Sequence, residues 1–341
     1  MAAERMARVR VGVIGLGRLW EARHRPALTR LSDRFVIRAV YDQVAHRAQA
    51  EAQSLGCAAP LGLNALVDLP DVDAIYLLSP QWFGLRSIEL AAQRGKPIYC
   101  ALPIAGAGDD LPRVREVMEA SKVPFMPELA RRFYPVTLRL RELLATTLGP
   151  PFEIQGQAWH SGFSRYGLPG PTTQMAPAPL LVDPGSYLID WCRFLFGREP
   201  LSMTGRWGPP MPDQAAEPDF EGFDADFGGG ALARVNVGLA RPNLEGDAGQ
   251  PTPPPGFRIR AERGEAWVEM PDRIRWTDEH GSHEERLPLE PGFGELLNNQ
   301  FYRLVCGLPT LAPSWDDALV VTDLVASLRA QSDARGSRSD A

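Results

Sequence analysis

The stretch VRVGVIGLGRLW, residues 9–20, decides the fold of the N-terminal half. Its first six residues, Val9 to Ile14, are typical of a buried strand, and a glycine pair follows directly before a helical pattern. In this context the backbone can approach a pyrophosphate at the helix N-terminus. The segment predicts a Rossmann domain that binds a nicotinamide dinucleotide. The residues expected around the phosphates are Gly15, Leu16, Gly17, Arg18 and Leu19.

The rest of the first third alternates apolar runs with helical patterns. Strands are predicted at 35–40, 72–78, 97–100 and 123–126, and helices at 21–31, 44–55, 85–94 and 109–121. Strands that are apolar throughout and separated by helices indicate parallel pairing with both faces of the sheet covered. The N-terminal half is therefore predicted to be a doubly wound α/β domain.

Two residues, Asp42 and Trp20, influence which cofactor is expected and how it fits. Asp42 ends the second predicted strand, where a carboxylate accepts hydrogen bonds from ribose hydroxyls and repels a 2′-phosphate, so NAD is favoured over NADP. Trp20 stands where the fingerprint has its third glycine. An indole there either shifts the helix outward or lies across the phosphate site. The alternative is a glycine turn in an α/β domain that binds no nucleotide.

The pattern changes after residue 127. A helix at 139–148, a strand at 152–159, a Pro- and Gly-containing loop at 161–179 and a helix at 184–196 are predicted. Alternating runs follow at 201–207, 231–239, 257–261, 266–270 and 273–277, and helices at 294–306 and 315–329. A period of two predicts an open, mostly antiparallel sheet in an α+β domain. The predicted domains are 1–127 and 128–331, with a disordered tail at 332–341.

Composition narrows the class of protein. The 341 residues are 44% apolar and 23% charged, which suits two packed domains, and the net charge of −6 argues against a nucleic-acid partner. No apolar run approaches the roughly 20 residues that span a bilayer. The N-terminus lacks the apolar core of a signal peptide, and four scattered cysteines suggest neither disulfides nor a metal site. A cytoplasmic homo-oligomer, dimer or tetramer, is expected, because an open sheet face has to be covered.

Several segments resemble the Gfo/Idh/MocA family, named for glucose–fructose oxidoreductase, inositol dehydrogenase and a rhizopine-catabolism protein. They occur in the family's order: VRVGVIGLG (9–17), AVYDQ (39–43), DVDAIYLLSP (71–80), GKPIYCALPIAG (95–106), ARRFYP (130–135) and VDPGSYLIDWCRFLFG (182–197). The resemblance implies hydride transfer between NAD(P) and a hydroxyl of a sugar or cyclitol, with a sugar-like molecule as substrate. It also implies that Ser79, Pro80 and Pro103 lie along the coenzyme.

The chain departs from the family at the positions that move protons. The family's lysine in an E-K-P motif is Leu102 here, its usual histidine after the Ser79-Pro80 position is Gly84, and its D-x-G-x-H histidine is Tyr187. The only lysines, Lys96 and Lys122, lie elsewhere in the pattern. Leu102 either lines an open cleft or belongs to the core.

Asp183, Tyr187 and Asp190 share one face of a predicted helix through their i, i+4 and i+7 spacing. Tyr187 and Asp183 are the candidate catalytic residues, and Arg132 and Asp190 the candidate substrate ligands. Tyr187 needs a nearby cation, Arg131 or Arg132, to lower its pKa from about 10. The structural alternatives are that Asp183 caps the helix and that Tyr187 only packs at a domain junction.

Two functions remain open at this point. One is an NAD(P)-dependent oxidoreductase with a rebuilt proton relay. The other is a non-catalytic family member that binds a nucleotide or sugar as a sensor or scaffold. Trp82 and Phe83 either pack near the nicotinamide or plug its pocket. His160 is expected to be structural. His280 and His283 lie in WTDEHGSHEER (276–286), which is typical of an acidic hairpin turn, and a metal site there would need further ligands.

Overall fold

The structure is a computed structural model that describes residues 8–102, 104, 111–161, 185–208, 220–240 and 256–339, with backbone only at 81, 159–161, 239–240 and 332–339. The chain forms two compact units. The first contains the chain up to Leu129 together with Glu290–Leu319, and the second contains Ala130–Leu289 and the chain from Val320 onward.

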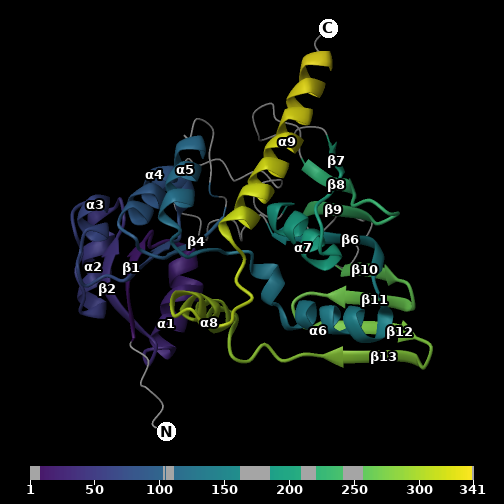
Figure 1. Cartoon of the computed structure of the whole chain (residues 1–341), viewed down its shortest axis with the longest axis horizontal. Coiled ribbons are helices and arrows are strands. Elements are labelled where there is room, and N and C mark those ends of the chain that lie inside the picture. The colour runs from purple at the N-terminus through teal and green to yellow at the C-terminus, as the bar shows by residue number, and fades with distance from the viewer. Residues whose placement is uncertain are drawn as a thin grey trace, which may run out of the picture. The chain divides into compact units, whose positions relative to one another are not determined.

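The first unit is built on a five-stranded parallel sheet, which confirms the predicted Rossmann fold (Figure 1). Its strands are β1 (Val9–Ile14), β2 (Phe35–Tyr41), β3 (Ala74–Leu77), β4 (Ile98–Cys100) and β5 (Phe125–Pro127), in the order β2-β1-β3-β4-β5. The chain leaves β1 toward β2 and later returns to β3 on the opposite side of β1. Ligands of open α/β sheets bind at the carboxyl ends of strands at such a switch point.

Helices connect these strands. They are α1 (Arg25–Arg30), preceded by a π-helical turn at Trp20–His24, α2 (Ala45–Leu55), α3 (Leu63–Val67), α4 (Pro80–Gln93) and α5 (Leu111–Ser121). Gly84 kinks α4, since its φ of 63° and ψ of −177° are not helical. The short α3 was not predicted, because its five residues are fewer than a periodic pattern needs.

Helix α8 (Phe293–Val305) belongs to the first unit, although the sequence assigns residues 128–331 to the second domain. Its Phe301 ring lies 5.2 Å from the ring of Tyr76 in β3 and 5.5 Å from that of Tyr99 in β4. Figure 1 shows α8 beside α1. The domain assignment from sequence was wrong here, because helical periodicity reveals an apolar face but not the surface that covers it.

The second unit contains an eight-stranded sheet, mostly antiparallel as predicted. Its strands are β6 (Pro151–Ser161), β7 (Ser202–Trp207), β8 (Phe220–Asp226), β9 (Leu232–Ala240), β10 (Gly256–Ala261), β11 (Gly264–Glu269), β12 (Arg273–Asp278) and β13 (Gly281–Arg286). The order is β13-β12-β11-β10-β6-β9-β8-β7, and only β6 and β9 pair in parallel among these described strands.

Helices pack on one face of this sheet. They are α6 (Pro135–Leu143), which continues as a π-helical turn to Leu148, and α7 (Ser186–Phe196). Trp191 of α7 lies 4.8 Å from the ring of Phe257 in β10 and donates a hydrogen bond to Thr137 of α6. On β10, Phe257 and Ile259 are buried, whereas Arg258 and Arg260 are exposed on the opposite face. The predicted open face is therefore present.

Three segments differ from the prediction. β8 was missed because its sequence, FEGFDAD, has acidic residues and a glycine where a strand usually has β-branched residues. β13 forms the second half of the segment predicted as an acidic hairpin turn at 276–286. α9 (Trp315–Ser339) extends past the predicted end at Arg329, so the backbone is helical where a disordered tail at 332–341 was expected. Polar composition alone does not end a helix that meets no proline.

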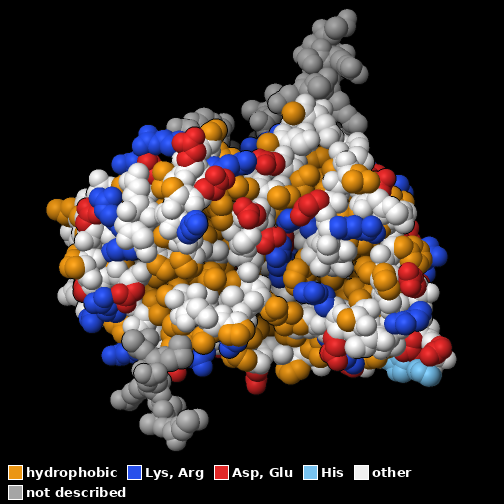
Figure 2. Space-filling view, in the orientation of Figure 1, with side chains coloured by type: hydrophobic (Ala, Val, Ile, Leu, Met, Phe, Trp, Pro, Cys, Tyr) orange, Lys and Arg blue, Asp and Glu red, His pale blue; other side chains and the backbone are white. Residues whose placement is uncertain are grey.

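No helix within the described ranges is both long and apolar enough to cross a membrane. On the face of the molecule in Figure 2, acidic and basic side chains are intermixed over both units.

Candidate cofactor site

The glycine loop follows β1 at the switch point. Gly15 has a φ of +94°, and a methyl group on it would lie 2.7 Å from Oγ of Ser79, so no other residue fits. Its N–H donates to the carbonyl of Tyr41 over 2.9 Å. Gly17 is different, because a methyl group there would meet nothing closer than 4.0 Å. The open space above Gly17 is what a backbone needs if a ligand is to approach it closely.

Asp42 is anchored beside this loop. Its Oδ2 accepts the N–H of Leu16 and its Oδ1 accepts the N–H of Val44, both over 2.9 Å, and the side chain is only 10% exposed. Each carboxylate oxygen can accept a further hydrogen bond. The structure thus brings Asp42 and the Gly15–Gly17 loop together, as the spacing predicts.

Trp20 lies against α2 and is 1% exposed. Its Nε1 donates to Oε1 of Glu51 over 3.0 Å, and Arg25 binds the same oxygen over 2.6 Å. The residue begins a π-helical turn, which is wider than an α-helical one, and such turns are frequent at functional sites. The helix that follows the glycine loop is thus locally widened at Trp20.

Ser79 and Pro80 begin α4 at the carboxyl end of β3. Pro80 occupies the first turn of the helix, where its missing N–H leaves no hydrogen bond unmade. Further along this turn, Phe83 lies 5.7 Å from the ring of Tyr41, and Trp82 is 47% exposed. Phe83 therefore packs on the end of β2, while Trp82 faces solvent.

The segment compared above with the family's E-K-P motif follows β4. Ala101 and Leu102 are buried, Leu102 with 9% exposure, and Pro103 lies outside the described residues. Leu102 is therefore a core residue rather than part of an open cleft.

In the second unit, Arg132 and Asp190 are brought together but bind each other. Arg132 Nε lies 2.8 Å from Asp190 Oδ2 and its Nη2 lies 2.6 Å from Oδ1, and both side chains are buried. Arg193 adds a contact of 3.1 Å to Asp190 and also binds Glu199. This cluster holds the start of α7 against the chain before α6.

Tyr187 is half-buried in the first turn of α7, one turn before Asp190, and Asp183 lies outside the described residues. Of the two cations expected near Tyr187, Arg131 contacts Sδ of Met270 with Nη1. Arg132 forms an ion pair with Asp190.

A buried polar network in the first unit was missed by sequence reasoning. Glu128, directly after β5, accepts hydrogen bonds from His24 Nε2 over 3.0 Å and the Tyr99 hydroxyl over 2.9 Å, and it is also paired with Arg23. Asn298 of α8 binds His24 Nδ1 and the Tyr76 hydroxyl, both over 3.2 Å. These partners are too distant in sequence for any periodic pattern to connect them.

The network has a charged centre. Burial by itself raises the pKa of Glu128, but the charge of Arg23 and the hydrogen bonds from His24 and Tyr99 outweigh it and lower that pKa to about 2. Burial raises the pKa of Tyr76 and Tyr99, so both phenols keep their protons and donate. Glu128 thereby ties the helix of the glycine loop to the end of β5.

The remaining histidines have other surroundings. His283 stacks on Trp276 with ring centroids 4.9 Å apart and lies 3.3 Å from Asp278, while the side chain of His160 is outside the described part. Among the side chains that the structure describes, no three His, Cys, Asp or Glu residues are grouped as a metal site would require.

Comparison with known proteins identifies the N-terminal unit. Residues 9–129 match the GFO_IDH_MocA model, described as an oxidoreductase family with an NAD-binding Rossmann fold. The chain is 29% identical to a D-xylose 1-dehydrogenase (NADP(+)) of Haloferax volcanii over 44% of its length and 46% of that protein's. It is 24% identical to the rhizopine catabolism protein MocA of Rhizobium meliloti over 71% of its length and 74% of that protein's.

The fold of the whole chain has a counterpart of similar size. The UDP-N-acetylglucosamine 3-dehydrogenase of Acidithiobacillus ferrooxidans superposes with a TM-score of 0.77 at 18% identity, covering 96% of this chain and 99% of that one. At this identity the likeness shows the fold alone. Residues 9–129 are thus similar to the NAD-binding Rossmann domain of the Gfo/Idh/MocA oxidoreductase family, and the chain as a whole is similar to MocA itself.

Proposed function

We propose that the protein is an NAD(P)-dependent oxidoreductase that transfers a hydride between the nicotinamide and a hydroxyl-bearing carbon of a sugar or cyclitol. The observation that carries the proposal is the glycine loop at the switch point, with Asp42 bound to its backbone. The relatives named above as xylose dehydrogenase and MocA support a sugar-like substrate.

The described residues fit a dinucleotide. Gly15, Leu16, Gly17, Arg18 and Leu19 would surround the pyrophosphate, and Ser79 and Pro80 would follow the coenzyme toward its nicotinamide. Asp42 would accept hydrogen bonds from the adenosine ribose, which favours NAD. The coenzyme supplies the hydride acceptor or donor. The chain has to orient it and to handle the proton of the substrate hydroxyl.

The proton acceptor has to be a residue other than the one at the position of the family's lysine, because the side chain of Leu102 cannot accept a proton. As hydride leaves the carbinol carbon, its hydroxyl proton has to pass to a base while a carbonyl forms. Following the family resemblance, we assign this role to Tyr187, with Asp183 as its partner. The buried Arg132–Asp190 pair would hold the first turn of α7 and so position Tyr187, rather than bind substrate directly.

A non-catalytic nucleotide- or sugar-binding protein is the second candidate, because an apolar, buried Leu102 replaces the family's lysine. Both candidate proteins are expected to bind NADH, but only the oxidoreductase is expected to turn over a substrate. NADH is titrated into the purified chain, and a panel of sugars and cyclitols is then assayed for coenzyme reduction.

Saturable NADH binding with turnover that Tyr187→Phe reduces about a hundredfold, at unchanged NADH affinity, is expected for the enzyme. Binding without turnover on any substrate would favour the sensor or scaffold. No binding at millimolar coenzyme would contradict both candidates.

We also propose that the protein is a homo-oligomer that uses the open face of the second unit's sheet. That face carries paired charges, including Arg260 with Glu153 over 2.9 Å and Arg275 with Glu269 over 3.1 Å. A second copy could cover it with complementary pairs. Light scattering coupled to size exclusion tests this, and a monomer at micromolar concentration would refute it.

A further inference from the structure

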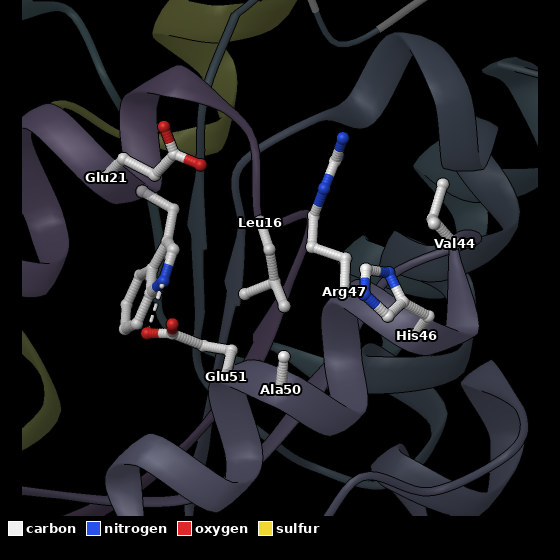
Figure 3. Close-up of a pocket in the computed structure, with 8 residues that line it drawn as sticks. Leu16, Glu21, Val44, His46, Arg47, Ala50 and Glu51 are labelled. Carbon is white, nitrogen blue, oxygen red and sulfur yellow. Dashed lines mark hydrogen bonds between the residues drawn. The ribbon is translucent and has the colours of Figure 1, made fainter.

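A hollow of about 330 Å³ lies between the helix of the glycine loop and the start of α2 (Figure 3). It is lined by Leu16, Trp20, Glu21, Val44, His46, Arg47, Ala50 and Glu51. Two of these residues, Leu16 and Val44, donate their backbone N–H groups to Asp42. The hollow therefore lies next to the Asp42 carboxylate, which would accept hydrogen bonds from the adenosine ribose.

Trp20 forms one wall of the hollow. A glycine at this position normally lets the first helix lie close to its neighbours. Here the buried indole bridges to α2 through its hydrogen bond with Glu51. Figure 3 shows Glu51, the partner of the indole, on one side of the hollow, and Arg47 and His46 on the other. The space holds several waters at ~30 Å³ each, so it has room for a phosphate group.

The charged side chains around the hollow differ in how firmly they are bound to partners within the chain. Glu51 is paired with Arg25, and Asp42 is held by two backbone amides. Arg47 Nη1 lies 3.6 Å from Asp42 Oδ2, beyond hydrogen-bond distance, and the Arg47 side chain is 50% exposed. Arg47 can therefore turn to an incoming anion while Asp42 keeps its amide partners. Glu21 lies on the rim of the hollow opposite Arg47 (Figure 3).

We propose that this hollow receives the 2′-phosphate of NADP(H) and that Arg47 is the specificity-determining residue. Arg47, with His46 beside it, offsets the repulsion of Asp42, so the chain binds NADP(H) as well as NAD(H). An arginine next to the ribose is the usual means of accommodating a 2′-phosphate. The inference rests on the proposed function, since it requires that a nicotinamide dinucleotide binds at the glycine loop.

Separate titrations with NADH and NADPH test the inference, following the fluorescence of the bound dihydronicotinamide. Arg47→Glu is compared with the wild type and with Arg38→Glu. Arg38 is a matched control in the same unit: its side chain is 47% exposed against 50% for Arg47, and it is loosely paired with Asp71 at 3.9 Å.

In the wild type, the Kd for NADPH is expected within about tenfold of that for NADH. Arg47→Glu should weaken NADPH binding by about tenfold or more and leave NADH within about twofold, because it places a negative charge beside the phosphate. Arg38→Glu should change neither.

A wild type that binds NADH but binds NADPH more than about a hundredfold more weakly would overturn the inference and leave the proposed function intact. An equal loss of both coenzymes in Arg47→Glu would show that Arg47 only supports Asp42, which also overturns it. If neither coenzyme binds the wild type, the proposed function itself fails.

Discussion

At the residue scale, the two glycines of the loop after β1 are required for different reasons. Gly15 is needed by the fold, since its φ is +94° and Ser79 occupies the space of a side chain. Gly17 has no such neighbour among the residues that the structure describes. The packing of these residues therefore requires glycine at position 15 but not at position 17.

Gly15→Ala should lower the free energy of unfolding by about 2 kcal/mol or more, because it combines backbone strain with a steric clash. Gly17→Ala should change it by less than about 0.5 kcal/mol, yet weaken NADH binding on the order of tenfold. Chemical denaturation and NADH titration of both variants check this. Unchanged NADH affinity in a stable Gly17→Ala protein would argue against a pyrophosphate at the loop.

Glu128 makes stability depend on pH in a defined direction. Its pKa falls from 4.5 to about 2 on folding, so the folded state is stabilised fully above pH 4.5 and loses that stabilisation as the pH falls toward 2. The difference corresponds to roughly 3 kcal/mol. The contribution is therefore constant near neutral pH.

Glu128→Gln should lower the free energy of unfolding at pH 7 by about 3 kcal/mol, since Arg23 and His24 lose a buried charged partner. It should also flatten the stability curve between pH 4.5 and 2. Glu142→Gln, at a glutamate that is 61% exposed, is the control and should do neither. Parallel acid-denaturation curves for the wild type and Glu128→Gln would contradict this assignment.

At the element scale, the two edges of the large sheet are protected in different ways. β13 ends in three consecutive charged side chains, Glu284, Glu285 and Arg286, which discourage pairing with another strand. β7 is covered by α9 instead. Gln331 accepts the N–H of Gly205 over 3.0 Å and donates to the carbonyl of Met203 over 2.9 Å. Its amide thus occupies the hydrogen-bonding groups that a neighbouring strand would use.

Gln331→Ala should therefore expose two backbone groups of an edge strand. We expect a loss of about 1–2 kcal/mol in the free energy of unfolding and increased aggregation on warming, measured by denaturation and light scattering. Gln53→Ala, at an exposed position of α2, is the control. If both variants behave like the wild type, the amide of Gln331 is not what protects β7.

Local patterns predicted most of the elements and the coenzyme loop, but not the long-range pairs. Gly15, Gly17 and Asp42 follow from spacing within one strand–helix–strand unit. The Arg132–Asp190 pair spans 58 residues and the His24–Glu128 pair spans 104, and no periodicity connects such positions. The π-helical turn at Trp20 escaped prediction because periodic patterns do not report a locally widened turn.

At the scale of the whole molecule, the chain passes between its two units three times, and the first unit is completed only by residues 290–319. These residues supply α8, which covers the rings of Tyr76 and Tyr99 and binds His24 through Asn298. The Rossmann sheet of this chain is therefore incomplete without a segment from near the C-terminus.

A fragment of residues 1–129 should consequently fail to unfold cooperatively, whereas the same fragment joined to residues 290–319 by a flexible linker should do so. Circular dichroism in a urea series distinguishes the two. Cooperative unfolding of the shorter fragment would show that α8 is dispensable for the first unit.

The late return of α8 has a consequence for biosynthesis. Although the glycine loop is among the first segments to leave the ribosome, α8 is complete only about 180 residues after β5, a delay of roughly 10–40 s at ~5–20 residues per second. During that interval the aromatic face of β3 and β4 is without its partner helix. We therefore expect a nascent chain of this protein to need chaperones until translation is nearly finished, and its coenzyme to bind only afterwards.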